Sequence, residues 1–158
     1  MILVAPDALR QVVEAAEAAY PGECCGLLVG HRLPNGTVEV SRAHASANLG
    51  KQPDRFEIDP RLWVDLARAL GKGPTKVVGL YHSHPDGPAQ PSAADLDAAW
   101  GEELVWLIVS VAKGEAIQVT AHILDHGGKQ FRELPLRTSD WAPYAVRPDP
   151  DKPPEEAP

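Results

Sequence analysis

Residues 77–85 read Val-Val-Gly-Leu-Tyr-His-Ser-His-Pro. The apolar run over 77–81 predicts a buried strand, which carries His82 and His84 at its C-terminal end. Side chains two residues apart in a strand project on the same side of the backbone. The two imidazoles can therefore bind one metal ion, and the sheet that contains this strand positions the site.

Around this strand, helix signals alternate with strand signals. Short apolar or alternating runs bounded by turn residues predict further strands at 25–30, 37–41, 104–109, 117–124 and 130–136. Apolar stripes and cap residues predict helices at 7–20, 60–70 and 92–100. Pro34-Asn35-Gly36 should turn the first two of these strands into a hairpin. The mixture predicts the α/β (α+β) class, with a mixed central sheet flanked by about three helices.

The length of 158 residues suggests one domain, because a second core would have little chain to build it. We expect that domain to occupy residues 1–140. Residues 141–158 are rich in proline and acidic side chains, which predicts a disordered tail.

Composition disfavours several classes of function. The formal net charge is −7 and the basic residues are scattered, which disfavours nucleic-acid binding. No apolar run approaches the ~20 residues that cross a bilayer, and the N-terminus does not resemble a signal peptide, so we expect a cytoplasmic protein. The only two cysteines, Cys24 and Cys25, are adjacent, which fits a reducing compartment and small buried side chains in a strand.

Asp95 completes a possible metal site with His82 and His84, because two imidazoles and a carboxylate are a typical ligand set of catalytic zinc. Ser92 precedes Asp95 by three residues at the predicted helix start, so the two side chains should be neighbours. The same pair has the form of an N-terminal cap, and capping alone would also explain it. The other histidines lack ligand spacing and are interpreted as ordinary surface or packing residues: His31, His44, His122 and His126.

The pattern His82-x-His84-Pro85, six residues, Ser92-x-x-Asp95 resembles the signature of the JAMM (MPN-plus, JAB-domain) zinc metalloproteases. The upstream segment Glu23-x-Cys25-Gly26-Leu27-Leu28-x-Gly30 resembles the other characteristic segment of that family. The similarity covers roughly residues 1–125. It implies a cytidine-deaminase-like mixed sheet flanked by helices.

The resemblance also implies a role for each matching residue. His82, His84 and Asp95 would bind one Zn²⁺ per chain. Glu23 would take a proton from the metal-activated water and later give it to the leaving amine. Ser92 would donate a hydrogen bond to the oxyanion at the scissile carbonyl. Zinc lowers the pKa of bound water to about 7, which is consistent with hydrolysis at neutral pH.

Members of that family characteristically cleave after a C-terminal Gly-Gly of ubiquitin or a ubiquitin-like protein. The chain passes from Asp95 to the strand at Leu104 without room for the insertions of eukaryotic members. It therefore resembles the compact prokaryotic branch, which processes ubiquitin-fold sulfur carriers. The expected partner is a ubiquitin-like or sulfur-carrier protein that ends in Gly-Gly.

Three alternatives belong to other classes. A general metallopeptidase for small peptides would use the same residues, and only substrate assays separate it from a carrier-specific enzyme. A non-catalytic scaffold of the same fold is disfavoured because all five candidate residues are present. A zinc deaminase is disfavoured because the Pro-Cys-x-x-Cys ligand segment is absent.

Overall fold

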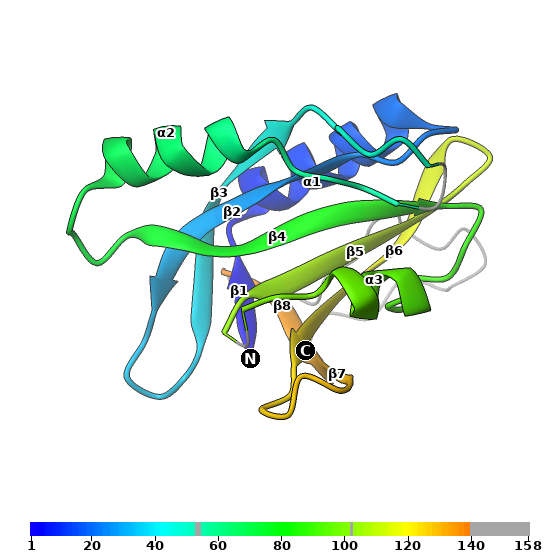
Figure 1. The fold of residues 1–158 in the computed structure, drawn as a ribbon. Helices are drawn as coiled ribbons and strands as arrows, with labels where there is room; N and C mark the ends of the chain where they lie inside the picture. Colours follow the sequence, from blue (N-terminus) through cyan, green and yellow to red (C-terminus); the bar gives the residue numbers. More distant parts are fainter. Residues whose placement is uncertain (53–54, 102, 140–158) are drawn as a thin grey trace, which may run out of the picture.

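A computed structural model describes residues 1–52, 55–101 and 103–139. One mixed sheet of eight strands crosses the domain, and helices cover it (Figure 1). The helices are α1 (Pro6–Ala19), α2 (Pro60–Leu70) and α3 (Ala93–Ala98). The strands are β1 (Ile2–Val4), β2 (Cys25–Arg32), β3 (Val38–Ser46), β4 (Lys76–Pro85), β5 (Val105–Ala112), β6 (Glu115–Leu124), β7 (Phe131–Leu134) and β8 (Leu136–Thr138). The predicted α+β class and the three predicted helices are confirmed.

The strand order is β7-β6-β5-β4-β2-β3-β1-β8, so β4 lies inside the sheet. β4 runs antiparallel to β2 and parallel to β5, and the predicted β2–β3 hairpin is present. In β5 the side chains from Val105 to Val111 are all buried, which confirms the predicted central strand. β4 is therefore hydrogen-bonded to a neighbouring strand on each side. This pairing fixes the backbone at its C-terminal end, which carries His82 and His84.

The two longer helices build separate apolar layers. Leu27 and Leu28 are neighbours in β2 and point to opposite faces of the sheet. Leu28 belongs to the core cluster that contains the buried side of α1, whereas Leu27 packs in the cluster that contains Leu66 of α2. Alternation along one strand thus explains why α1 and α2 pack on different faces.

The sequence-based prediction of one strand over 130–136 was wrong. Proline has no backbone N–H and interrupts a strand ladder, and Pro135 separates β7 from β8. β7 pairs with β6 at one edge of the sheet, whereas β8 pairs in parallel with β1 at the other. The β1 strand was not predicted either. Its three residues acquire partners only because β3 and β8 lie on its two sides.

The predicted tail, residues 141–158, lies outside the described residues. Among the described helices, none combines the length and the apolar character that crossing a membrane requires.

Candidate metal site and its cavities

The C-terminal end of β4 brings His82 and His84 together, as the spacing predicts. Their Nε2 atoms are 2.9 Å apart. The His82 side chain is completely buried, and the ring of Phe56 stacks on it with centroids 4.2 Å apart. His84 is partly exposed. One imidazole is therefore sealed inside the domain, and the other faces the surface of the site.

Helix α3 supplies the carboxylate. Asp95 is 4% exposed, with Oδ1 at 3.1 Å from Nε2 of His82 and Oδ2 at 3.1 Å from Nε2 of His84. The Ser92 hydroxyl accepts a hydrogen bond from the Asp95 backbone N–H, and Oδ2 accepts one from the Ser92 N–H. This capping box confirms the predicted capping pair. The hydroxyl acts as an acceptor in this bond, so its own proton is available to a substrate.

The donor atoms at this point fit a metal cation. Nδ1 of His84 lies 2.8 Å from the Pro88 carbonyl oxygen, which can only accept, so Nδ1 carries the proton. In the neutral ring the Nε2 lone pair then faces a carboxylate oxygen and a second imidazole nitrogen. The lone pairs of these atoms repel one another, and a cation between them would remove this repulsion. Ligands of a tetrahedral zinc ion lie about 3.3 Å apart, close to the separations of 2.9 and 3.1 Å here.

The ionisation of the three groups follows from burial and from their mutual contacts. Burial alone would raise the pKa of Asp95, but hydrogen bonds from His82 and His84 hold it well below its usual range. Burial lowers the pKa of His82. For His84 burial acts in the same direction, but hydrogen bonds to Asp95 and Pro88 outweigh it and raise the pKa. The site is therefore anionic at Asp95, with one readily protonated imidazole.

The loop that follows the histidines is tied to the strands beneath it. The Ser110 hydroxyl donates to the Gly87 carbonyl oxygen, and the Thr120 hydroxyl donates to that of Ala89 at 2.6 Å. His122 is buried and donates from Nε2 to the Thr120 hydroxyl at 2.8 Å, because that oxygen has already given its proton to Ala89. His122 is thus a packing residue, as interpreted, but one that supports the site loop. Sequence spacing carried no signal for this role.

Glu23 lies between α1 and β2, far from the metal ligands in sequence, yet it lines the same cavity as His84 and Ser92. That cavity has a volume of about 560 Å³. One carboxylate oxygen of Glu23 is buried, and its backbone carbonyl accepts a hydrogen bond from the Asn48 side chain at 3.3 Å. The structure therefore brings the predicted proton-transfer residue beside the predicted ligands.

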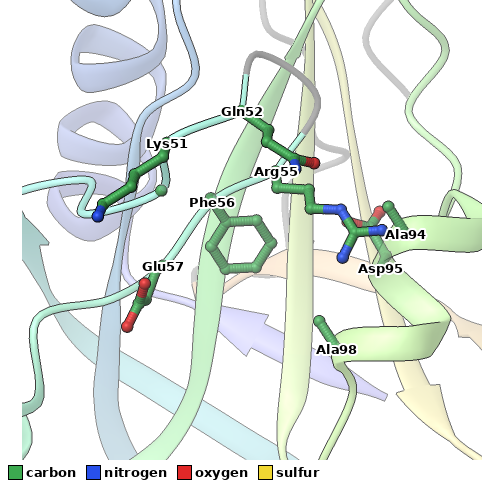
Figure 2. Close-up of a pocket in the computed structure, with 9 residues that line it drawn as sticks. Lys51, Gln52, Arg55, Phe56, Glu57, Ala94, Asp95 and Ala98 are labelled. Atoms are coloured by element: carbon green, nitrogen blue, oxygen red, sulfur yellow. The ribbon is translucent and has the colours of Figure 1, made fainter.

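A second opening reaches the site from the Asp95 side. A cavity of about 370 Å³ lies between residues 50–52 and 55–57 on one side and α3 on the other, with Asp95 in its wall (Figure 2). In Figure 2 the Arg55 side chain extends toward Ala94 and Asp95 of α3, whereas Lys51 and Glu57 extend away from α3. An apolar cavity of about 500 Å³ lies next to the cavity of about 370 Å³, and Phe56 and Ala98 line both. An extended chain therefore has room on both sides of the metal ligands.

The cysteines do not offer an alternative nucleophile. Both are free thiols, and Cys25 is buried at the start of β2, as predicted. Burial raises the pKa of Cys24, and it raises that of Cys25 to about 12. Neither thiol ionises readily at neutral pH, so thiolate chemistry is disfavoured.

Comparison with known proteins agrees with this geometry. Residues 5–122 match the family model described as prokaryotic homologues of the JAB domain. The desampylase of Haloferax volcanii is 34% identical over 80% of this chain and 85% of its own length. A probable TtuB-protein conjugate cleaving protease of Thermus thermophilus is 34% identical over 61% of this chain and 81% of its own length. The solution structure of a protein from Desulfitobacterium hafniense superimposes on this structure with a TM-score of 0.75 and 28% sequence identity. The match covers 88% of this chain and 93% of that chain.

Proposed function

The chain belongs to the family of prokaryotic homologues of the JAB domain, and on that premise we propose that it is a zinc-dependent isopeptidase or peptidase. Its substrates are ubiquitin-like or sulfur-carrier proteins, cleaved after a C-terminal Gly-Gly. The Thermus relative is described as cleaving protein conjugates, which supports this class of substrate. The observation that carries the proposal is the shared cavity of Glu23, His84 and Ser92 beside the His82–Asp95 pair.

Zinc is the metal proposed for His82, His84 and Asp95, one ion per chain. These three residues would hold the ion, which would supply a Lewis acid that makes water nucleophilic near neutral pH. The Pro88 carbonyl fixes the tautomer of His84 that presents Nε2 to the ion. The Phe56 ring covers His82 and keeps solvent from that side.

The proposed roles of the two remaining residues follow from their positions in the cavity. The Glu23 carboxylate accepts a proton from the attacking water and returns it to the leaving amine, as a general base and then a general acid. The Ser92 hydroxyl donates to the oxygen of the scissile carbonyl as negative charge develops there. Ser92 can do so without leaving the helix cap, because the cap uses the hydroxyl oxygen and not its proton.

A metal analysis and a matched set of fusion proteins test the proposal. The purified protein should bind about one zinc ion per chain, as expected of a site with three protein ligands. A His82→Ala, His84→Ala double variant should lose it. Full zinc content in that variant would contradict the site.

The fusion substrates should present a ubiquitin-fold carrier joined to a reporter through Gly-Gly, Ala-Ala or Val-Val. We expect cleavage of the Gly-Gly fusion and little cleavage of the other two. Equal rates on all three would contradict the proposed specificity and favour a general peptidase.

A further inference from the structure

A hydrogen bond outside the candidate catalytic set joins the two segments that form the Glu23 side of the cavity. The Tyr20 hydroxyl lies 3.0 and 2.9 Å from the two carboxylate oxygens of Asp86 and donates to that carboxylate. Tyr20 ends α1 and lies three residues before Glu23, while Asp86 follows Pro85 at the end of β4, two residues after His84. The bond therefore connects the Glu23 segment to the His84 loop.

The short segment from Tyr20 to Cys24 is attached at one end to β4 and at the other to Asp86, the residue that follows β4. At its far end the Cys24 N–H donates to the Ser83 hydroxyl at 2.9 Å, and the Cys24 carbonyl accepts from the Ser83 N–H at 3.2 Å. At its near end the Tyr20–Asp86 bond makes the attachment. Glu23 lies between the two, so both attachments determine where its carboxylate stands relative to His84.

The backbone of Asp86 is itself fixed in place. Its backbone N–H donates to the Val111 carbonyl oxygen at 2.6 Å, and its φ of 56° places it in the left-handed region, which aspartate and asparagine tolerate better than most residues. The Tyr20 ring packs against the main core cluster. Each partner is thus anchored before the hydrogen bond forms, which is what a positioning contact requires.

We propose that Tyr20 and Asp86 are positioning residues that hold the Glu23 carboxylate at its working distance from the metal ligands. The inference rests on the proposed hydrolase function. It adds a pair of residues that touches neither the metal nor the substrate. Loss of the bond lets the walls of the cavity separate, and a displacement of ~1 Å at a reacting group can lower a rate about 10²-fold.

Kinetics of four variants test the proposal on the zinc-loaded protein with the Gly-Gly fusion. Tyr20→Phe and Asp86→Ala should each lower kcat at least about ten-fold with KM and zinc content unchanged, because proton transfer and not binding is affected. The double variant should lose no more than either single one, as expected for two groups that act through one bond. Asp86→Asn should restore most of kcat, because its amide oxygen also accepts from Tyr20 and asparagine tolerates the left-handed backbone.

Arg10→Gln is the matched control, because it removes another exposed hydrogen-bonded pair of α1, Arg10 with Asp7, at the opposite end of the helix. It should leave kcat unchanged. A kcat in Tyr20→Phe equal to that of the active wild type would overturn the proposal, as would Asp86→Asn behaving like Asp86→Ala.

Amide hydrogen exchange of the metal-free protein gives a readout that does not depend on activity. The Cys24 N–H should exchange at least about ten-fold faster in Tyr20→Phe than in the wild type, since opening of this segment becomes easier. An unchanged Cys24 exchange rate would overturn the positioning role. The exchange measurement tests the positioning role even if the wild type cleaves no fusion. Absence of cleavage by the wild type would count against the proposed function alone.

Discussion

At the residue scale, Asp95 connects the start of α3 to both imidazoles. One of its oxygens accepts from the Ser92 N–H and also approaches His84, while the other approaches His82. The capping box therefore does two things at once: it caps the start of the helix and orients the carboxylate. Substitutions at Ser92 can separate the contribution of the cap from that of the hydroxyl proton.

Ser92→Ala should lower kcat by about 10²–10³-fold if the hydroxyl stabilises the oxyanion, and should also destabilise the fold by about 1 kcal/mol through loss of the cap. Ser92→Gly should show the same loss of kcat with a stability change of only a few tenths of a kcal/mol, because glycine is a tolerated cap residue. Thermal unfolding and kcat measured on both variants decide the question. A nearly intact kcat in Ser92→Gly would leave capping as the only role of Ser92.

Glu23→Gln should retain zinc and the fold while losing about 10²–10⁴-fold in kcat, since the amide keeps the shape of the side chain but cannot transfer the proton. The measurements are zinc content and turnover of the Gly-Gly fusion. Glu14→Gln is the control, because Glu14 is an exposed carboxylate on α1 and should have no effect. Substantial activity of zinc-loaded Glu23→Gln would mean that another group moves the proton.

At the element scale, the position of the site depends on close contact between β4 and β5. Gly79 of β4 pairs with Val105 of β5, and a Cβ atom at Gly79 would overlap the carbonyl oxygen of Val105. A glycine is therefore required there by the neighbouring backbone, not by its own dihedral angles. The close contact at Gly79 allows β4 to pair with β5 without interruption as far as His82 and His84.

Gly79→Ala should lower the free energy of unfolding by about 1–3 kcal/mol, the usual cost of adding atoms to a well-packed core. Denaturant unfolding of the metal-free protein measures it. In Gly127→Ala, by contrast, the nearest atoms to the new Cβ are 3.9 Å away, so this control should change stability by less than about 0.5 kcal/mol. Equal effects at the two positions would show that the β4–β5 contact is not as tight as described.

At the scale of the whole molecule, protons and the metal ion compete for one site. The pKa of His84 is raised above its ordinary 6.5, whereas burial lowers that of His82. Only neutral imidazoles bind metal, so a proton on His84 must leave before zinc can bind. Burial favours the neutral form of His82, so its proton adds less to the competition than that of His84.

Zinc affinity should therefore fall as the pH drops through the raised pKa of His84, by about ten-fold per pH unit below it. Competition with a chelator of known pH dependence, between about pH 5.5 and 8, measures this slope. The expected ten-fold change per pH unit is a slope of one in the logarithm of zinc affinity against pH. A slope near two would mean that both histidines carry protons in the metal-free protein. A flat profile would contradict the raised pKa of His84.

Contacts between near neighbours in the chain could be predicted from the sequence by itself. The helix from Pro60, the β2–β3 hairpin, the projection of His82 and His84 to one side and the cap at Ser92 all depend on periodicity or on groups a few residues apart. Such features are local, because backbone geometry alone determines which of these side chains meet. The motif as a whole also identified the family, through a resemblance and not through geometry.

Contacts between distant segments were decided only by the tertiary structure. No local pattern shows that Pro135 divides one strand between opposite edges of the sheet, that Phe56 stacks on His82, or that Tyr20 bonds to Asp86. The approach of Glu23 to His84 was expected only from the family resemblance. These contacts depend on how the strands, and the loops and helix ends attached to them, are arranged around the sheet, and a single sequence does not state which strands pair.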